Sequence, residues 1–233
     1  MNFFYAPPQN WKENRTAVEI TGQEAIHISR VLRYKVGNEI FVADGIGKRS
    51  RCLIKEISKK SVTAEVIETE SKSEPTIKKV LAFGAIKKRD RLEFAIEKAV
   101  ELDAWEICVF DADHSERSRL NEERLHTQIV SAFKQSGRFY LPELVIKRSL
   151  DEVLEQYKEH SVLMAYLGED KTGIPGELKN HENLLLVGPE GGFSKREADV
   201  AKSKGAQFIT LGKNRLRAET AVVVFLSQFL FSK

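Results

Sequence analysis

Beyond residue 75, short apolar runs alternate with amphipathic segments of helical length, and this alternation restricts the fold more than any other feature. Apolar runs of roughly four to eight residues are typical of strands buried on both faces. The segment Asp90–Leu102 places Leu92, Ala95, Ile96 and Ala99 on one face of a helix. Strands that alternate with such helices predict a parallel α/β sheet covered by helices on both faces.

We assign the elements of this part from the same periodicities. The expected strands are Val80–Ile86, Glu106–Asp111, Val162–Tyr166, Leu184–Val187 and Gln207–Leu211. The other expected helices are Asn121–Ser136, Leu150–Lys158, one that starts at Ser194, and Glu219–Phe231. Ser194 and Glu197 have the spacing of a capping box, which favours a helix start there.

The first 70 residues have a different pattern, rich in β-formers and turn residues. We expect strands at Glu39–Ala43, Arg51–Ile57 and Ser61–Ile67, and a helix at Gly22–Leu32. Strands at this spacing predict a small β-barrel. The polar stretch Ser71–Pro75 is interpreted as a linker, so two domains are expected, 1–72 and 73–233.

The charge is divided unevenly between these two parts. The 233 residues carry a net charge of +3, with 12 Lys/Arg against 9 Asp/Glu in residues 1–72 and 25 of each in residues 73–233. A basic module joined to a neutral one suggests that the first domain binds a polyanion. Ordinary scatter in composition is the alternative interpretation of so small an excess.

Several classes of protein are excluded by composition. No apolar run approaches the roughly 18–20 residues of a membrane-spanning helix, and the N-terminus lacks the pattern of a signal peptide. Two cysteines cannot form a disulfide framework, and five scattered histidines have no metal-ligand spacing. We therefore expect a soluble cytoplasmic protein without a metal and without a membrane partner.

Two loops after expected strands carry the strongest functional signal. The first, Gly188–Ser194, contains the letters GPEGGFS, and its glycines allow a close approach of backbone to a ligand. The second follows Leu211 and ends in the letters LRAETA, so that Arg217 and Glu219 open an apolar helix. Arginine at a helix N-terminus is unfavourable for the helix dipole, which suggests a function for Arg217. A structural ion pair of Arg217 with Glu219 or Glu190 is the alternative.

These motifs together resemble one family. The chain contains, in order, His27 with Val31–Arg33, the letters EKAVEL at Glu97–Leu102, Gln135-Ser136 with Arg138, GPEGG at Gly188–Gly192, and LRAETA at Leu216–Ala221. This is similar to the RsmE family of bacterial 16S rRNA uridine-N3 methyltransferases, of the SPOUT class. One departure is Asp103, which stands where similar proteins usually carry glycine after Glu-Leu.

The resemblance implies a PUA-like β-barrel that contacts RNA, followed by a parallel-sheet SPOUT domain with a C-terminal trefoil knot. It also implies a homodimer, a substrate that is 16S rRNA or the 30S subunit, and S-adenosylmethionine as methyl donor. The donor would lie among the knot loops. The residues expected to bind it are Leu186, Val187, Gly188, Pro189, Gly191, Gly192, Leu211, Gly212, Asn214, Leu216 and Arg217.

The chemistry assigns roles to charged residues of the same loops. Methylation at uridine N3 requires loss of a weakly acidic proton, and Arg217 is expected to stabilise the resulting anion. Glu190 and Glu219 are candidate proton acceptors, with solvent as an alternative. Basic residues are expected to contact RNA phosphates, namely Arg30, Arg33, Lys35, Arg49, Arg51 and Arg138.

Two other functions are left open by the sequence. One is a SPOUT enzyme that methylates a ribose 2′-hydroxyl or another base. The other is an RNA-binding ribosome-assembly factor without methyltransferase activity. The intact Gly188, Gly191, Gly192, Arg217 and Glu219 argue against it.

Overall fold

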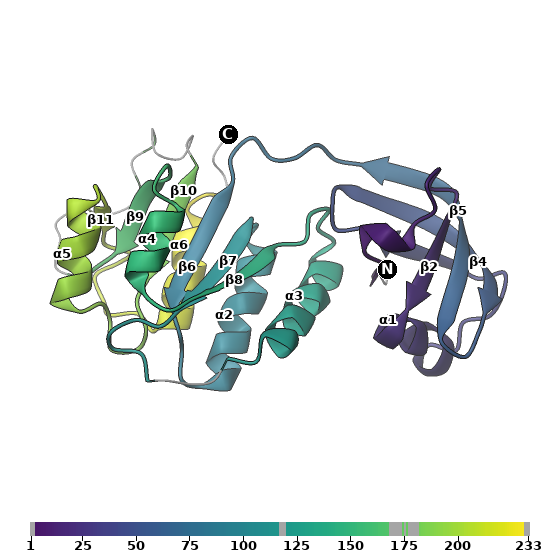
Figure 1. The fold of residues 1–233 in the computed structure, drawn as a ribbon, viewed down its shortest axis with the longest axis horizontal. Coiled ribbons are helices and arrows are strands. Elements are labelled where there is room, and N and C mark those ends of the chain that lie inside the picture. Colours follow the sequence, from purple (N-terminus) through teal and green to yellow (C-terminus); the bar gives the residue numbers. More distant parts are fainter. Residues whose placement is uncertain (1–2, 117–119, 168–173, 175, 177–181, 231–233) are drawn as a thin grey trace. The chain divides into compact units, whose positions relative to one another are not determined.

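The computed structural model describes residues 3–116, 120–167, 174, 176 and 182–230 (Figure 1). The chain divides into two compact units. One comprises Met1–Glu74 and Phe133–Leu141, and the other comprises Pro75–Ala132 and Pro142–Lys233. In the part of the chain that is described, no helix has the length and apolar composition needed to cross a membrane.

The N-terminal unit is built on a curled five-stranded sheet with the order β1-β3-β4-β5-β2. Its neighbours are antiparallel except for the parallel pair β1 and β3. The strands are β1 (Phe3–Tyr5), β2 (Ala17–Thr21), β3 (Glu39–Ala43), β4 (Lys48–Ile57) and β5 (Ser61–Ser71). The three strands expected from the sequence are confirmed, whereas β1 and β2 were not predicted.

One helical segment lies against this sheet. α1 (Gly22–Ile26) continues into a wider π-helical turn, η2 (His27–Val31), so the expected helix is present but not regular throughout. The alternating residues of the strands and the inner face of the helix form one apolar core. Its large members include Phe4, Trp11, Ile20, Ile28, Ile40, Ile54 and Val62.

A segment remote in sequence, Phe133–Leu141, completes the N-terminal unit. The Arg49 guanidinium donates a hydrogen bond to the Gly137 carbonyl over 2.6 Å and lies 3.7 Å from the centre of the Phe139 ring. The Tyr140 hydroxyl donates to the Lys72 carbonyl over 2.7 Å. The sequence-based limit at residue 72 does not include this segment, because no local pattern signals a contact between residues so far apart.

The larger unit contains a six-stranded sheet with the order β11-β9-β10-β6-β7-β8, in which all pairs are parallel. The strands are β6 (Lys79–Gly84), β7 (Glu106–Phe110), β8 (Glu143–Lys147), β9 (Ser161–Ala165), β10 (Asn183–Val187) and β11 (Gln207–Ile209). The predicted parallel sheet is confirmed, and β8 is the strand that the sequence analysis missed.

Helices cover both faces of this sheet, as expected. The helices are α2 (Arg89–Glu101), α3 (Glu122–Ser136), α4 (Leu150–Gln156), α5 (Lys195–Ser203) and α6 (Ala218–Ser227). The pair α4 and α5 packs on one face. On the other face α6 packs against β6 and β10, and α2 packs against α6.

The order of the strands places a switch point in the middle of the sheet. β6 is the first strand of the unit, yet it lies between β7, which follows it in sequence, and β10, which comes much later. Connections leave the neighbouring strands β6 and β10 in different directions at this point. In open α/β sheets, ligands bind outside the carboxyl ends of the strands at such a position.

The C-terminus of α2 explains the departure at Asp103. Asp103 has φ +62°, the left-handed conformation that favours glycine. The Ala104 N–H donates to the Ala99 carbonyl over 3.0 Å, and the Asp103 N–H donates to the Val100 carbonyl over 3.3 Å. This is the hydrogen-bond pattern of a Schellman motif, and aspartate is one of the few other residues that adopt this conformation readily.

Substitutions at residue 103 test this assignment. Asp103→Val should lower the free energy of unfolding by about 1–2 kcal/mol, because a β-branched side chain is strained at positive φ. Asp103→Gly should leave it within about 1 kcal/mol of the parent. Urea unfolding of the three proteins measures both effects. Equal stability of the valine and glycine variants would contradict a conformational origin.

Candidate functional site

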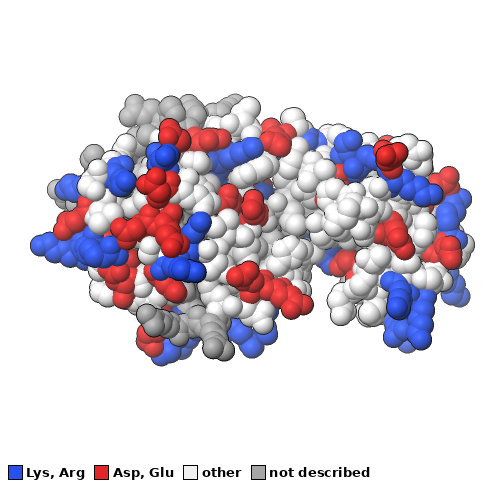
Figure 2. All heavy atoms as spheres, viewed as in Figure 1, with Lys and Arg blue, Asp and Glu red and all other residues white. Residues whose placement is uncertain are grey.

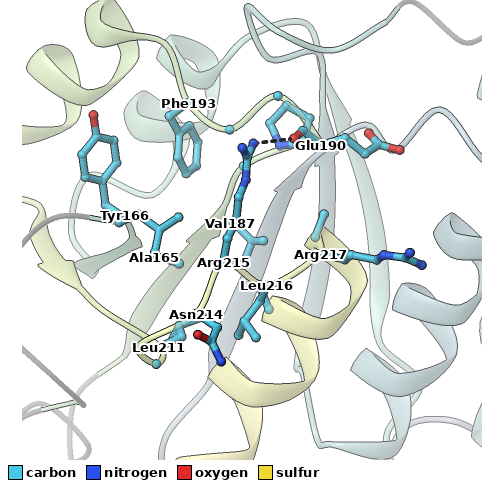
Figure 3. Close-up of a pocket in the computed structure, with 18 of the residues that line it drawn as sticks. Ala165, Tyr166, Val187, Glu190, Phe193, Leu211, Asn214, Arg215, Leu216 and Arg217 are labelled. Atoms are coloured by element: carbon cyan, nitrogen blue, oxygen red, sulfur yellow. Dashed lines mark hydrogen bonds between the residues drawn. The ribbon is translucent and has the colours of Figure 1, made fainter.

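A cavity of about 500 Å³ opens at the carboxyl ends of β9, β10 and β11 in the larger unit (Figure 3). Three loops form most of its wall, and the start of α6 and one side chain of α2 complete it. The lining residues are Arg91, Ala165, Tyr166, Leu167, Val187, Gly188, Pro189, Glu190, Gly191, Gly192, Phe193, Leu211, Gly212, Asn214, Arg215, Leu216, Arg217, Ala218 and Ala221.

The loop after β10 folds tightly and packs on the loop after β7. The Gly192 N–H donates to the Pro189 carbonyl over 2.9 Å, and Gly192 has φ +74°. A Cβ at Gly191 would lie 2.8 Å from the His114 Cβ, closer than real side chains approach. Glycine at 191 is therefore required by the protein's own packing, in addition to any ligand that approaches the loop.

The start of α5 anchors the same loop. Ser194 and Glu197 form the predicted capping box, in which the Ser194 Oγ accepts from the Glu197 N–H and the Glu197 carboxylate accepts from the Ser194 N–H. Glu197 is buried, and its other oxygen accepts a hydrogen bond from the Asp113 N–H over 3.1 Å. The cap thereby holds the loops after β7 and β10 together.

An ion pair strengthens this connection on the surface. The Arg196 guanidinium donates to both carboxylate oxygens of Asp113, over 2.8 and 2.9 Å, and to Asp151 over 2.8 Å. Hydrogen bonds from Arg196 and then from Ser194 lower the pKa of Asp113 to about 2.

The loop after β11 contacts the loop after β10 across the cavity. The Arg215 guanidinium donates to the Glu190 carbonyl over 3.2 Å, and Figure 3 shows it reaching toward Glu190. Figure 3 also shows Arg217 extending away from Leu211 and Leu216. The Arg217 side chain makes no hydrogen bond or ion pair with any residue that the structure describes, so the pair with Glu219 or Glu190 considered for it is not found there. The Arg217 carbonyl accepts a hydrogen bond from the Ala221 N–H over 2.8 Å at the start of α6.

Glu219 lies behind the cavity wall. It is in the first turn of α6 and is 9% exposed, and its Oε1 atom lies 3.5 Å from the Arg91 Nε. The other oxygen, Oε2, is buried and has no partner within the described structure. Glu219 is not among the residues that line the cavity, and neither is Leu186, whose side chain belongs to the core beneath the sheet.

Most residues expected to bind the donor meet in this one cavity. The structure brings together Val187, Gly188, Pro189, Gly191, Gly192, Leu211, Gly212, Asn214, Leu216 and Arg217, together with Glu190. The sequence analysis named neither Arg91 nor Arg215 as site residues. Arg215 lies inside a loop already singled out and could have been included, whereas only the packing of α2 against α6 brings Arg91 to the cavity.

The expected RNA-binding residues all lie in the N-terminal unit, Arg138 by virtue of the segment Phe133–Leu141. Arg30, Arg33 and Lys35 are exposed, near the end of η2, and Figure 2 shows basic side chains gathered at the α1 end of this unit. Arg49 and Arg51 are engaged instead in contacts within the unit. Arg49 pairs with Glu70, and Arg51 pairs with Glu39 and Glu68.

Comparison with known proteins defines the class. The sequence model of the RNA methyltransferase domain matches residues 72–230, and that of the RNA methyltransferase PUA domain matches residues 20–67. The described residues contain no cluster of three or more His, Cys, Asp or Glu that would hold a metal ion.

Relatives define the family more narrowly. The ribosomal RNA small subunit methyltransferase E of Bacillus subtilis is 30% identical over 231 residues, which cover 92% of this chain and 90% of the relative. The structure of a methyltransferase of the same name from Neisseria gonorrhoeae, bound to S-adenosylmethionine, is 25% identical and superposes with a TM-score of 0.80 over 97% of this chain and 95% of that one. A probable rRNA methyltransferase from Porphyromonas gingivalis is 31% identical, with a TM-score of 0.83 over 97% and 96% of the two chains. The chain belongs to the family of ribosomal RNA small subunit methyltransferase E.

The ion pair of Asp113 predicts how stability depends on pH. Because its pKa is lower in the folded protein than the roughly 3.9 of an unfolded chain, the pair stabilises the fold above about pH 4 and this contribution is lost as the pH falls toward 2. The effect should be modest, since both side chains are partly exposed. Urea unfolding between pH 5 and pH 2 should show a steeper loss of stability for the parent than for Asp113→Asn. If the free energy of unfolding fell equally with pH in the two proteins, Asp113 would not contribute to the pH dependence of stability.

Proposed function

We propose that this chain transfers a methyl group from S-adenosylmethionine to N3 of a uridine in 16S rRNA of the small ribosomal subunit. The observation that carries the proposal is the convergence of the GPEGG loop and the LRAETA loop on one cavity at the carboxyl ends of β10 and β11. Membership in the methyltransferase E family supports both the donor and the ribosomal substrate.

The cavity suits such a donor. Its volume of about 500 Å³ is within the range of roughly 300–1,000 Å³ that is typical of sites for small ligands. Ala165, Val187, Leu211 and Leu216 provide apolar walls for a flat purine ring, and backbone groups of the glycine loop provide hydrogen bonds for polar parts. When bound, the donor supplies an electrophilic methyl group on a sulfonium, which needs no metal to react.

The charged side chains of the cavity suit the acceptor. N3 of uridine lies on the Watson–Crick edge, so the base must be unpaired before its imide proton can leave. Arg217, exposed at the rim and unpaired in the described structure, would stabilise the negative charge that develops on the base. Among the described residues that line the cavity, Glu190 is the one carboxylate, and it is the proton acceptor that this placement favours, with solvent as the alternative.

The remaining expectations from the resemblance belong to the same proposal. We propose that the chain is a homodimer that works in the cytoplasm and that its C-terminal part forms a trefoil knot. We also propose that the expected domain 1–72, extended by the segment Phe133–Leu141, contacts the 16S rRNA of the 30S subunit. Exposed Arg30, Arg33 and Lys35 support an RNA-binding surface on the N-terminal unit.

Methyl transfer from labelled S-adenosylmethionine tests the proposal directly. Small ribosomal subunits from a strain that lacks this enzyme, and naked 16S rRNA, are offered as substrates, and the product nucleoside is identified by mass spectrometry. Labelled 3-methyluridine is expected. A ribose-methylated nucleoside would overturn the specificity, and RNA binding without methyl transfer would favour an assembly factor.

The role of Arg217 can be separated from donor binding in the same assay. Arg217→Ala should lower kcat by about 10²–10³, the usual effect of removing one group that stabilises transition-state charge. The donor Kd, measured by calorimetry, should change little, and Arg217→Lys should restore part of the rate. Equal losses in kcat and donor affinity would instead make Arg217 a binding residue.

Gly212 offers a test of the donor position that does not disturb internal packing. A Cβ at Gly212 has no atom within 4 Å, whereas a Cβ at Gly191 would collide with His114. Gly212→Val should therefore leave the melting temperature nearly unchanged while weakening donor binding by at least about tenfold, because its side chain enters ligand space. Gly212→Ala should show a smaller effect in the same direction. Unaltered donor affinity in Gly212→Val would exclude this part of the cavity.

A further inference from the structure

The ion pair between Arg91 and Glu219 has no role in the functions assigned so far. Glu219 is buried at the first turn of α6, where the positive end of the helix dipole favours a carboxylate. Its Oε1 lies 3.5 Å from the Arg91 Nε, which is close enough for attraction but long for a hydrogen bond. A buried carboxylate oxygen without a hydrogen bond, as Oε2 is within the described structure, is unfavourable and calls for an explanation.

Arg91 connects this buried charge to the cavity. It belongs to the first turn of α2, which packs against α6, and its side chain lines the cavity with 24% of its surface exposed. The shortest contact of Arg91 with Glu219 is through its Nε, and the two terminal nitrogens of the guanidinium donate no hydrogen bond to a residue that the structure describes. The terminal nitrogens of an arginine form a planar fork that matches the oxygens of a phosphate.

The other arginines near the cavity are used differently. Arg215 donates to the Glu190 carbonyl and connects two loops. Arg89, two residues before Arg91 on α2, is exposed and lies near Glu93 on the helix surface. Among the described residues of the lining, Arg91 and Arg217 are the two arginines whose guanidinium groups donate no hydrogen bond to a described residue. Arg91 stands on α2 and Arg217 directly precedes α6, and these two helices pack together.

We propose that Arg91 binds a phosphate of the acceptor RNA beside the target nucleotide, and that Glu219 is the positioning residue that holds the Arg91 guanidinium for this contact. The proposal rests on the proposed function. The donor is expected among the loops after β9, β10 and β11, whereas Arg91 stands on α2, which leaves it for the second substrate. A fixed cation there would bring the RNA backbone to the cavity without reading its sequence.

Glu219 acts in this proposal through electrostatics and not through proton transfer. An unpaired arginine beside a cavity samples many rotamers, and fixing one of them beforehand reduces the entropy lost on binding. A buried carboxylate restricts the Nε side and leaves the terminal nitrogens exposed. Removal of the Glu219 carboxylate should therefore weaken the contact between Arg91 and the RNA phosphate, although Arg91 keeps its positive charge.

Charge-removing variants with matched controls test the proposal, once the parent enzyme has been shown to methylate its substrate. Arg91→Met should raise KM for the RNA substrate about tenfold or more and reduce the slope of log K against log salt by about 0.7–0.9. The Kd for S-adenosylmethionine should stay within about twofold. Arg89→Met, which removes a charge from the same helix outside the cavity, should change neither quantity. Arg91→Lys, which keeps the charge, should keep most of the slope and provides a second test if the methionine variant is unstable.

A double-mutant cycle tests the positioning role. Glu219→Gln should raise KM for RNA in the parent but add nothing in the Arg91→Met background, because its effect passes through Arg91. Additive losses would overturn the positioning role of Glu219. An unchanged KM and salt slope in Arg91→Met would overturn the phosphate contact.

One further outcome would show that the anion bound by Arg91 belongs to the methyl donor and not to the RNA. If Arg91→Met weakens binding of S-adenosylmethionine but not of methylthioadenosine, which lacks the amino-acid part, Arg91 binds the donor carboxylate and the RNA contact is refuted. An inactive parent enzyme would instead contradict the proposed function and is distinguishable from all these results.

Discussion

All six strands of the larger sheet run in one direction, and the organisation of the site depends on this constraint. Parallel strands place every loop that follows a strand at the same edge, and β10 lies beside β6 at the point where the connections diverge. Three loops separated widely in sequence can therefore enclose one cavity. The contacts between loops, such as that of Arg215 with the Glu190 carbonyl, connect loops that the sheet has already brought together.

The arginines that line the cavity have different functions, which depend on the group that each side chain contacts. The Arg215 side chain connects two loops, the Arg217 side chain has no hydrogen bond or ion pair with a described residue, and the Arg91 guanidinium lies beside the buried Glu219. One arginine therefore connects two loops of the protein, whereas the others keep guanidinium N–H groups available for a ligand. What distinguishes these arginines is the position of a nearby oxygen, and the sequence does not contain that information directly.

The sequence predicted the parts of the structure that depend on local periodicity. Strands buried on both faces, such as β10, and the capping box of Ser194 were found because short-range physics determines them. β1 was missed because three residues carry no usable period. Leu186 was assigned to the cavity from its place in a motif, yet in a strand of alternating orientation it faces the core. Arg91 could not be found because its position depends on how α2 packs against α6.

The segment Phe133–Leu141 has a consequence for how the chain can be made and divided. The hydrogen bond from Arg49 to Gly137 closes a separation of 88 residues, and that from Tyr140 to Lys72 closes one of 68. The N-terminal unit is therefore discontinuous in sequence, although it is compact in space. During synthesis it lacks its final segment until residue 141 has left the ribosome, by which time α2 and β7 are already available to fold. A fragment cut at residue 74 would also lack the backbone that Arg49 contacts, so isolation of this unit requires a permuted or co-expressed segment.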